Sequence, residues 1–155
     1  MIRLIRTSSD HGDFTNLVRR LDAELWERYE ELQAQYARHN KVEKNNTVVL
    51  AYADNLPSGC GCFKKYNDDT VEVKRMFVAH DHRGKGIAGL ILKELECWAK
   101  ELGYSKVILE TGLKQPEAIG LYKKAGFVVT ENYEPYVNMK ESVCMQKFLN
   151  GKDIA

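Results

Sequence analysis

A glycine-rich segment in the middle of the chain has the residue types needed to bind a phosphate group. Residues 80–92 read HDHRGKGIAGLIL and contain a G-x-G-x-x-G pattern at Gly84, Gly86 and Gly89. Glycines let backbone N–H groups approach an anion closely, and an apolar pattern of helical period follows at once. Arg83 and Lys85 can add charge-assisted hydrogen bonds. The segment therefore predicts an anion-binding loop at the start of a helix.

The same glycine pattern occurs in dinucleotide-binding proteins, but its surroundings argue against that interpretation. Glu110 lies 21 residues after Gly89 (110 − 89), which matches the offset of a ribose-binding acid. However, residues 79–83 separate the predicted strand from the first glycine, whereas a dinucleotide-binding turn places that glycine directly after the strand. The 45 residues after Glu110 (155 − 110) are too few for the remaining βα units. A P-loop is excluded, because no Gly-Lys pair is followed by Ser or Thr.

Hydrophobic periodicity predicts the elements that position this loop. An alternating pattern predicts a strand over residues 2–6, and helical spacing predicts one long helix or two short helices from Asp13 to Tyr36. Turn residues and β-branched runs predict strands over 47–52, 59–66, 71–78, 106–111, 127–133 and 142–149. Further helices are predicted over 87–102 and 116–124. This order predicts an α/β (mixed α+β) fold, with helices on both faces of a mixed sheet.

The composition predicts one soluble domain with a localised binding site. The chain has 155 residues, a net charge of +1, 44% hydrophobic and 29% charged residues, without the basic excess of a nucleic-acid-binding protein. No segment resembles a signal peptide or a membrane span, so we expect a cytoplasmic protein without membrane contacts. The four cysteines are expected to be free thiols, and His80 and His82 are not expected to hold a metal. The sequence does not decide between a monomer and a homodimer.

Two motifs resemble those of the Gcn5-related N-acetyltransferase (GNAT) family. The segment VEVKRMFV, followed by RGKGIA, is similar to the family's acetyl-CoA-binding motif Arg/Gln-x-x-Gly-x-Gly/Ala, here Arg83, Gly86 and Ala88. A second motif, Asn, Ala and then Tyr-x-x-x-Gly-Phe, has its counterpart in Gln115, Ala118, Tyr122, Gly126 and Phe127, with Gln115 in place of the Asn. The resemblance implies a GNAT-like, mostly antiparallel sheet of about seven strands in one domain, residues 1–155. Residues 47–149 would form the acetyl-CoA-binding core, and residues 1–46 the first strand and the acceptor-side helices.

The resemblance also implies acetyl-CoA as the cosubstrate, with no metal. The pantetheine arm would bond backbone groups of strand 71–78, and an amide near Val78 would polarise the thioester carbonyl. The pyrophosphate would lie on the glycine loop at the start of the helix. The implied cofactor-binding residues are Met76, Phe77, Val78, Arg83, Gly84, Lys85, Gly86, Ile87, Ala88, Gln115 and Tyr122.

Glu72 is the candidate general base. An alkyl amine titrates near ~10.4, so the acceptor must lose a proton before it attacks the thioester. Glu72 is expected on the central strand beside the thioester, and it can act directly or through a water molecule. Glu110 and bulk water are the alternatives for this step. The structural alternative for Glu72 is an ion pair with Lys74 or with the neighbourhood of Arg75.

Tyr122 is the candidate general acid. It occupies the family's position for the group that protonates the CoA thiolate, and the structural alternative is simple packing beside Ala118. A covalent route through Cys144 or Cys62 is the other chemical alternative, but neither thiol has a nearby base in the sequence.

The acceptor is expected to enter from the face opposite the cofactor. Aromatic and acidic side chains there suit an aliphatic ammonium. The candidates are Tyr29, Glu30, Glu110, Tyr133 and Tyr136. The sequence thus predicts an acetyl-CoA-dependent N-acetyltransferase that acts directly on a primary amine of a small molecule, amino-acid derivative or peptide. The alternative is a non-catalytic acyl-CoA-binding or regulatory module, and a longer acyl donor stays open.

Overall fold

The computed structural model describes residues 1–28 and 44–149. Two predicted acceptor-binding residues, Tyr29 and Glu30, lie outside these ranges, as does the predicted continuation of the first helix to Tyr36. Within the described ranges, no helix is long and apolar enough to cross a membrane.

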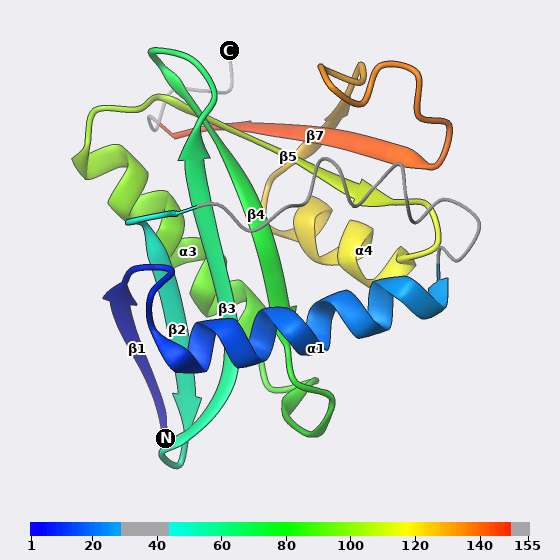
Figure 1. Cartoon of the computed structure of the whole chain (residues 1–155). Coiled ribbons are helices and arrows are strands. Elements are labelled where there is room, and N and C mark those ends of the chain that lie inside the picture. The colour runs from blue at the N-terminus through cyan, green and yellow to red at the C-terminus, as the bar shows by residue number, and fades with distance from the viewer. Residues whose placement is uncertain (29–43, 150–155) are drawn as a thin grey trace.

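A single seven-stranded sheet forms the centre of the molecule (Figure 1). The strands lie in the order β1-β2-β3-β4-β5-β7-β6, and neighbours are antiparallel except for the parallel pair β4 and β5. Their bounds are β1 Ile2–Thr7, β2 Val48–Ala53, β3 Leu56–Lys65, β4 Thr70–Val78, β5 Lys106–Gly112, β6 Val128–Thr130 and β7 Ser142–Phe148. The predicted mixed, mostly antiparallel sheet is confirmed.

Helices cover both faces of this sheet. The helices are α1 Gly12–Arg28, the short 3-10 helix η2 His80–His82, α3 Ile87–Glu101 and α4 Pro116–Lys124. In Figure 1, α1 crosses in front of β2, β3 and β4, whereas α3 lies behind them. Pro116 stands in the first turn of α4, as predicted, because its missing N–H costs nothing there.

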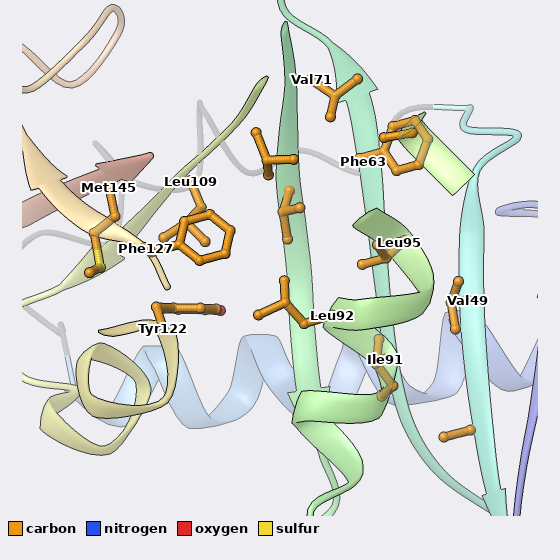
Figure 2. Close-up of a cluster of buried hydrophobic side chains, with 14 of the residues drawn as sticks. Val49, Phe63, Val71, Ile91, Leu92, Leu95, Leu109, Tyr122, Phe127 and Met145 are labelled. Atoms are coloured by element: carbon orange, nitrogen blue, oxygen red, sulfur yellow. The ribbon is translucent and has the colours of Figure 1, made fainter. Parts of the chain in front are cut away.

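Two buried clusters hold the helices to the sheet, one on each face. Alternate residues of a strand point to opposite faces, and every residue of β2 is buried because both faces are covered. Val49 packs toward α3 with Ile91 and Leu95, which Figure 2 shows. The next residue, Leu50, packs in the other cluster with Phe14 and Leu17 of α1. We refer to these clusters as the α3-side core and the α1-side core.

The structure corrects the extent of the strand predicted over residues 127–133. β6 spans only Val128–Thr130. The chain leaves the sheet because Asn132 organises a loop instead: its side-chain amide donates to the carbonyl oxygens of Tyr136, Met139 and Ser142 at 3.1, 3.3 and 3.4 Å. This loop carries Tyr133 and Tyr136, two predicted acceptor-site residues, over one end of the sheet.

The two parallel strands separate halfway along their length, and this opening positions the candidate site. β4 and β5 are paired from Thr70 and Lys106 to Val73 and Leu109. Beyond that point, Lys74–Val78 pairs with β3 alone among the described residues. Figure 1 shows β4 and β5 close together at one end and diverging toward the other. We refer to this separation of the two strands as the β4–β5 opening, and along it the edge of β4 is not paired with β5.

A bulge in β4 lies on this unpaired part of the strand. The register with β3 shifts between Cys60 and Cys62, and Arg75 has a left-handed φ of 61°. A non-glycine residue in this conformation is uncommon and costs about 1–2 kcal/mol. The buried Arg75 side chain pairs with Asp22 of α1, with 2.8 Å between Nη1 and Oδ1. The bulge is thus held in place from the α1 side.

Candidate active site

The glycine loop ends at the N-terminus of α3, as the sequence predicts. Gly84 and Gly86 have φ values of 81° and 79°, and a Cβ atom at either position would meet no atom within 4 Å. These glycines are therefore required by backbone conformation rather than by lack of space. Gly86 caps α3 without a side-chain hydrogen bond, and the first turn of the helix has no acidic residue. Its N–H groups and positive dipole end are available to an anion.

Arg83 is bound to neighbouring elements, although 39% of its side chain is exposed to solvent. Its Nε donates to the Val78 carbonyl oxygen at 2.8 Å, and its Nη2 pairs with Glu24 of α1 at 2.6 Å. The guanidinium also lies 5.6 Å from the ring centroid of Phe77. In this arrangement the Arg83 side chain ties the loop to β4 and α1, and the groups of the loop that can bind an anion are its backbone N–H groups and the exposed Lys85 side chain.

The predicted pantetheine-binding residues lie beside the opening between β4 and β5. The side chains of Met76 and Val78 pack toward the α3-side core, and Phe77 is buried in the α1-side core. Because these side chains pack in the two cores, the groups of residues 76–78 that can face the opening are backbone N–H and C=O groups. Ile87 of the adjoining helix is buried, and Ala88 is half-buried.

Tyr122 lies on α4 with its ring buried next to the opening. The ring is 7% exposed and contacts Phe127 edge-to-face, with centroids 5.9 Å apart. Figure 2 shows its side chain extending from α4 toward the region of Leu92 on α3. Burial, and secondarily the Glu110 carboxylate, raise the pKa of the Tyr122 hydroxyl. The hydroxyl is protonated, and it has no hydrogen-bond partner among the described residues.

Gln115, which replaces the family's Asn, stands at the N-cap of α4. Its side chain makes no capping hydrogen bond, and its backbone N–H donates to the Gly112 carbonyl oxygen at 3.0 Å. The half-buried Gln115 side chain is therefore not used to terminate the helix.

Glu72 is buried on the face of the sheet opposite α3. The Tyr133 hydroxyl donates to its Oε2 at 2.7 Å, and Lys64 Nζ lies 4.0 Å from its Oε1. Burial, and then the charge of Glu72, raise the pKa of Tyr133, so this hydroxyl stays protonated as a donor. The structural alternative for Glu72 was an ion pair with Lys74 or with the neighbourhood of Arg75. Arg75 itself pairs with Asp22 and not with Glu72.

Glu110 lies at the point where β4 and β5 separate. Ser142 Oγ donates to its Oε2 at 2.8 Å. Burial raises the pKa of Glu110 to about 7, and the Ser142 hydrogen bond and the charge of Lys74 oppose the shift. A carboxyl group with this pKa can exchange a proton near neutral pH.

Lys74 is a residue of this face that the sequence predictions did not include in the site. Its Nζ donates to the Tyr136 hydroxyl at 3.3 Å, and burial lowers the pKa of its ammonium. The available sequence signal was period-2 alternation: on a strand, Lys74 must share a face with Glu72, two residues earlier. Ser142 was also missed, and because it lies 32 residues from Glu110, no local pattern could have indicated the pair.

Three tyrosines line the same face. The rings of Tyr66 and Tyr133 are 5.3 Å apart, and those of Tyr133 and Tyr136 are 5.6 Å apart, both pairs edge-to-face. Tyr136 is buried, with 1% of its surface exposed. The two predicted acceptor residues of this loop therefore contact Glu72 and Lys74 through their hydroxyl groups, and their rings brace one another.

The buried cysteines are poorly suited to covalent catalysis. Burial raises the pKa of Cys62 to about 12 and that of Cys144 to about 11. Both side chains are thiols at neutral pH, and the thiolate is the nucleophilic form. This disfavours the covalent alternative. Among the described residues, no group of three or more His, Cys, Asp or Glu side chains is arranged to hold a metal ion.

The predicted residues thus fall into two groups on either side of the β4–β5 opening. The glycine loop, the end of β4 and Tyr122 adjoin the α3 side, and Glu72, Glu110, Tyr133 and Tyr136 adjoin the other face. The predicted roles of these residues in binding and catalysis stay predictions.

Comparison with known proteins identifies the family to which this architecture belongs. Residues 13–127 match the model of the acetyltransferase (GNAT) family. Because the match covers most of the chain, the protein belongs to the GNAT family, and the resemblance seen in its two motifs is confirmed.

Individual relatives and solved structures are similar to it over different lengths. The IAA acetyltransferase of Azospirillum brasilense is 41% identical over 76 residues, which are 49% of this chain and 50% of that protein. The N-acetyltransferase 8 of Homo sapiens is 39% identical over 69 residues, 41% of this chain and 30% of that protein. The chain thus spans half or less of these relatives. A GNAT acetyltransferase from Elizabethkingia anophelis, solved with acetyl-CoA bound, superimposes with a TM-score of 0.69 at 23% identity and covers 96% of this chain and 98% of that one.

Proposed function

We propose that the protein is an acetyl-CoA-dependent N-acetyltransferase that transfers the acetyl group directly to a primary amine of a small molecule, amino-acid derivative or peptide. The observation that carries this proposal is the opening between β4 and β5. It lies next to a loop with positive-φ glycines at the start of α3. An extended pantetheine arm can bond the free edge of β4 while its pyrophosphate bonds the loop. Relatives named acetyltransferases and a neighbour solved with acetyl-CoA support this assignment.

The residues around the opening can supply each proton transfer of the reaction. The acceptor ammonium first gives a proton to Glu110, which lies where the strands separate, and the neutral amine nitrogen then attacks the thioester carbon. The oxyanion that forms is stabilised by a backbone N–H near Val78. When the C–S bond breaks, the Tyr122 hydroxyl donates its proton to the CoA sulfur. The new amide nitrogen loses its extra proton, which returns to Tyr122 through solvent, and Glu110 releases its proton to solvent, so the net reaction gives the amide, CoA and one proton.

This assignment favours Glu110 over Glu72 as the base because of their partners and positions. Glu72 lies on the paired part of β4, opposite Ile108, and it accepts the Tyr133 hydrogen bond. Glu110 lies at the first position beyond the pairing, and Ser142 bonds only one of its oxygens. The second oxygen, Oε1, has no hydrogen-bond partner among the described residues and can accept a proton from a bound amine.

Ligand-dependent unfolding and CoA release test the proposed function. At 100 times its Kd a ligand adds roughly 2.7 kcal/mol to the free energy of unfolding, and each kcal/mol moves the midpoint of a domain this size by about 2–4 °C. We expect acetyl-CoA and CoA to raise the midpoint by roughly 5–10 °C and NADH to leave it unchanged. With amines present, acetyl-CoA should be converted to free CoA. No shift with either CoA species would contradict the proposal.

The pH dependence of kcat tests the role of Glu110. The carboxyl group has a pKa of about 7, so the fraction of ionised base increases as the pH rises through this value. At saturating acceptor, we expect kcat to fall about tenfold per pH unit below that pKa. Glu110→Gln should lower kcat and remove this acidic limb. Glu72→Gln is the matched control and should keep the limb; if instead it alone removes the limb, Glu72 is the base.

A further inference from the structure

We propose that the acceptor carries a carboxylate close to its reacting amine, as an α- or β-amino acid does, and that Lys74 is the residue that selects it. The inference rests on the proposed function and specifies the substrate class of the same site. It is carried by the juxtaposition of Lys74 and Glu110 at the point where β4 and β5 separate.

Strand register places these two opposite charges across the opening. The last paired residues are Val73 and Leu109, and both side chains are buried in the α3-side core. Since successive side chains alternate between faces, Lys74 and Glu110 point to the opposite face, where the acceptor is expected. They are the first residues of their strands beyond the pairing. A ligand entering there meets an ammonium on one strand and a carboxylate on the other.

Both charged groups are oriented by hydroxyl groups while some of their surface stays accessible. Glu110 accepts from Ser142 Oγ at 2.8 Å, and Lys74 Nζ donates to the Tyr136 hydroxyl at 3.3 Å. Each of the two charged residues is half-buried rather than fully buried. Their positions are therefore fixed, and a small ligand can still contact them.

The charges favour an acceptor with both an amine and a carboxylate. An acceptor with a second ammonium group near its reacting amine would place it beside Lys74, where like charges in a partly buried site repel, and a monoamine would gain nothing from Lys74. A carboxylate on the acceptor makes the electrostatic interaction with the Lys74 ammonium attractive, while the amine of the acceptor reaches Oε1 of Glu110. Burial also removes hydration from the Lys74 ammonium, which lowers its pKa. A bound carboxylate would add a charge-assisted hydrogen bond to the contacts that Lys74 already makes.

The spacing of the strands limits the distance between the two ligand charges. Paired strands lie about 4.8 Å apart, and Lys74 and Glu110 come directly after the last pair. An acceptor whose amine and carboxylate are close together therefore suits these two neighbouring charges better than one whose anionic group is remote from the amine.

A panel of paired acceptors tests the inference on the unmodified protein. Each L-amino acid is compared with the amine that lacks its carboxylate: leucine with isopentylamine, phenylalanine with phenethylamine, lysine with cadaverine. Spermidine is added as a polycation. CoA release is followed at fixed acetyl-CoA. We expect kcat/KM to be at least about tenfold higher for the carboxylated member of the productive pairs, as for a close charge pair worth about 1.4 kcal/mol.

Substitution of Lys74 tests the residue assignment. Lys74→Met removes the charge and nearly keeps the volume, and we expect it to reduce the preference for the carboxylated member to within about twofold. Most of this change should be an increased KM for the amino acid. Lys74→Arg is the matched control that keeps the positive charge, and it should keep the preference. Thermal midpoints of both variants, with and without CoA, show whether the fold and the cofactor site are intact.

Two outcomes would overturn the inference while the proposed function stands, and a third would overturn both. Equal or faster turnover of the amines and spermidine by the unmodified protein contradicts the substrate class while the acetyltransferase function stands. An unchanged preference in a folded Lys74→Met variant contradicts the role of Lys74. CoA release with none of the acceptors, despite a thermal shift with acetyl-CoA, contradicts both the inference and the proposed turnover.

Discussion

Replacing Gly86 by valine is expected to weaken the binding of acetyl-CoA and of CoA by about 100-fold. The residue has a φ of 79°, which costs a β-branched side chain more than the roughly 1–2 kcal/mol typical of other residues. The new side chain would also stand in front of the N–H groups at the start of α3, where an anion gains up to about 2 kcal/mol. The free loop can relieve the strain by leaving this conformation, and the ligand must then restore it, so together these effects amount to about 3 kcal/mol, or about 100-fold in Kd. Titration calorimetry with each ligand measures the loss.

Gly89 provides a matched control within the same glycine motif. It lies inside α3 without a positive φ, and a Cβ atom added there would meet no atom within 4 Å. Gly89→Ala should therefore leave ligand affinity unchanged and stabilise the protein by up to roughly 0.5–1 kcal/mol, the effect of this change in a helix interior, since Gly89 lies in the first turn of α3. An equal loss of affinity in both variants would contradict the assignment of the anion site to the loop that ends at Gly86.

Tyr122→Phe is expected to lower kcat by about 100-fold while the Kd of acetyl-CoA changes less than about twofold. A general acid contributes at least this factor when the leaving group needs a proton. Burial raises the pKa of the Tyr122 hydroxyl, so it holds its proton until the thiolate forms. Phenylalanine keeps the ring and its edge-to-face contact with Phe127. Steady-state kinetics at saturating acceptor and calorimetry with acetyl-CoA measure the two quantities.

A second tyrosine shows whether the loss is specific to the site. Tyr104 packs edge-to-face against Phe63, 6.4 Å between centroids, away from the β4–β5 opening. Tyr104→Phe should keep kcat within about twofold. Unchanged kcat in Tyr122→Phe would exclude the acid role and leave Tyr122 as a packing residue. A non-catalytic acyl-CoA-binding module would bind acetyl-CoA but show no turnover in the unmodified protein, and the kinetic comparison would not be possible.

The sequence allowed the elements and the cofactor side of the candidate site to be predicted because their signals are local. Helical spacing of apolar residues defined α3, and Pro116 marked the start of α4. Gly84 and Gly86 adopt positive φ values, a conformation that glycine readily allows. The glycine motif therefore indicates the loop from a few neighbouring residues. The end of β6 was predicted wrongly, because the Asn132 hydrogen bonds that end it span up to 10 residues.

The acceptor side was less predictable because its contacts join distant segments. Glu72 and Tyr133 are 61 residues apart, and Lys74 and Tyr136 are 62 residues apart. The position of Lys74 opposite Glu110 depends on the residue at which β4–β5 pairing stops, which no periodicity indicates. The sequence therefore indicated Glu72 and Glu110 as candidate bases without showing their hydrogen-bond partners. Those partners are what favours Glu110 over Glu72 as the base.

The two arginine pairs with α1 determine how the cofactor side discriminates between anions. Arg75 and Arg83 stand on the bulge and at the loop, and their charges are balanced by Asp22 and Glu24. The two arginines therefore add little net positive field to this region, in which Lys85 of the loop is exposed. A ligand gains binding free energy there mainly by fitting the N–H groups of the loop and the free edge of β4, and Lys85 can add a charge-assisted hydrogen bond. The protein can thus select one phosphorylated molecule among the many that compete for basic surfaces.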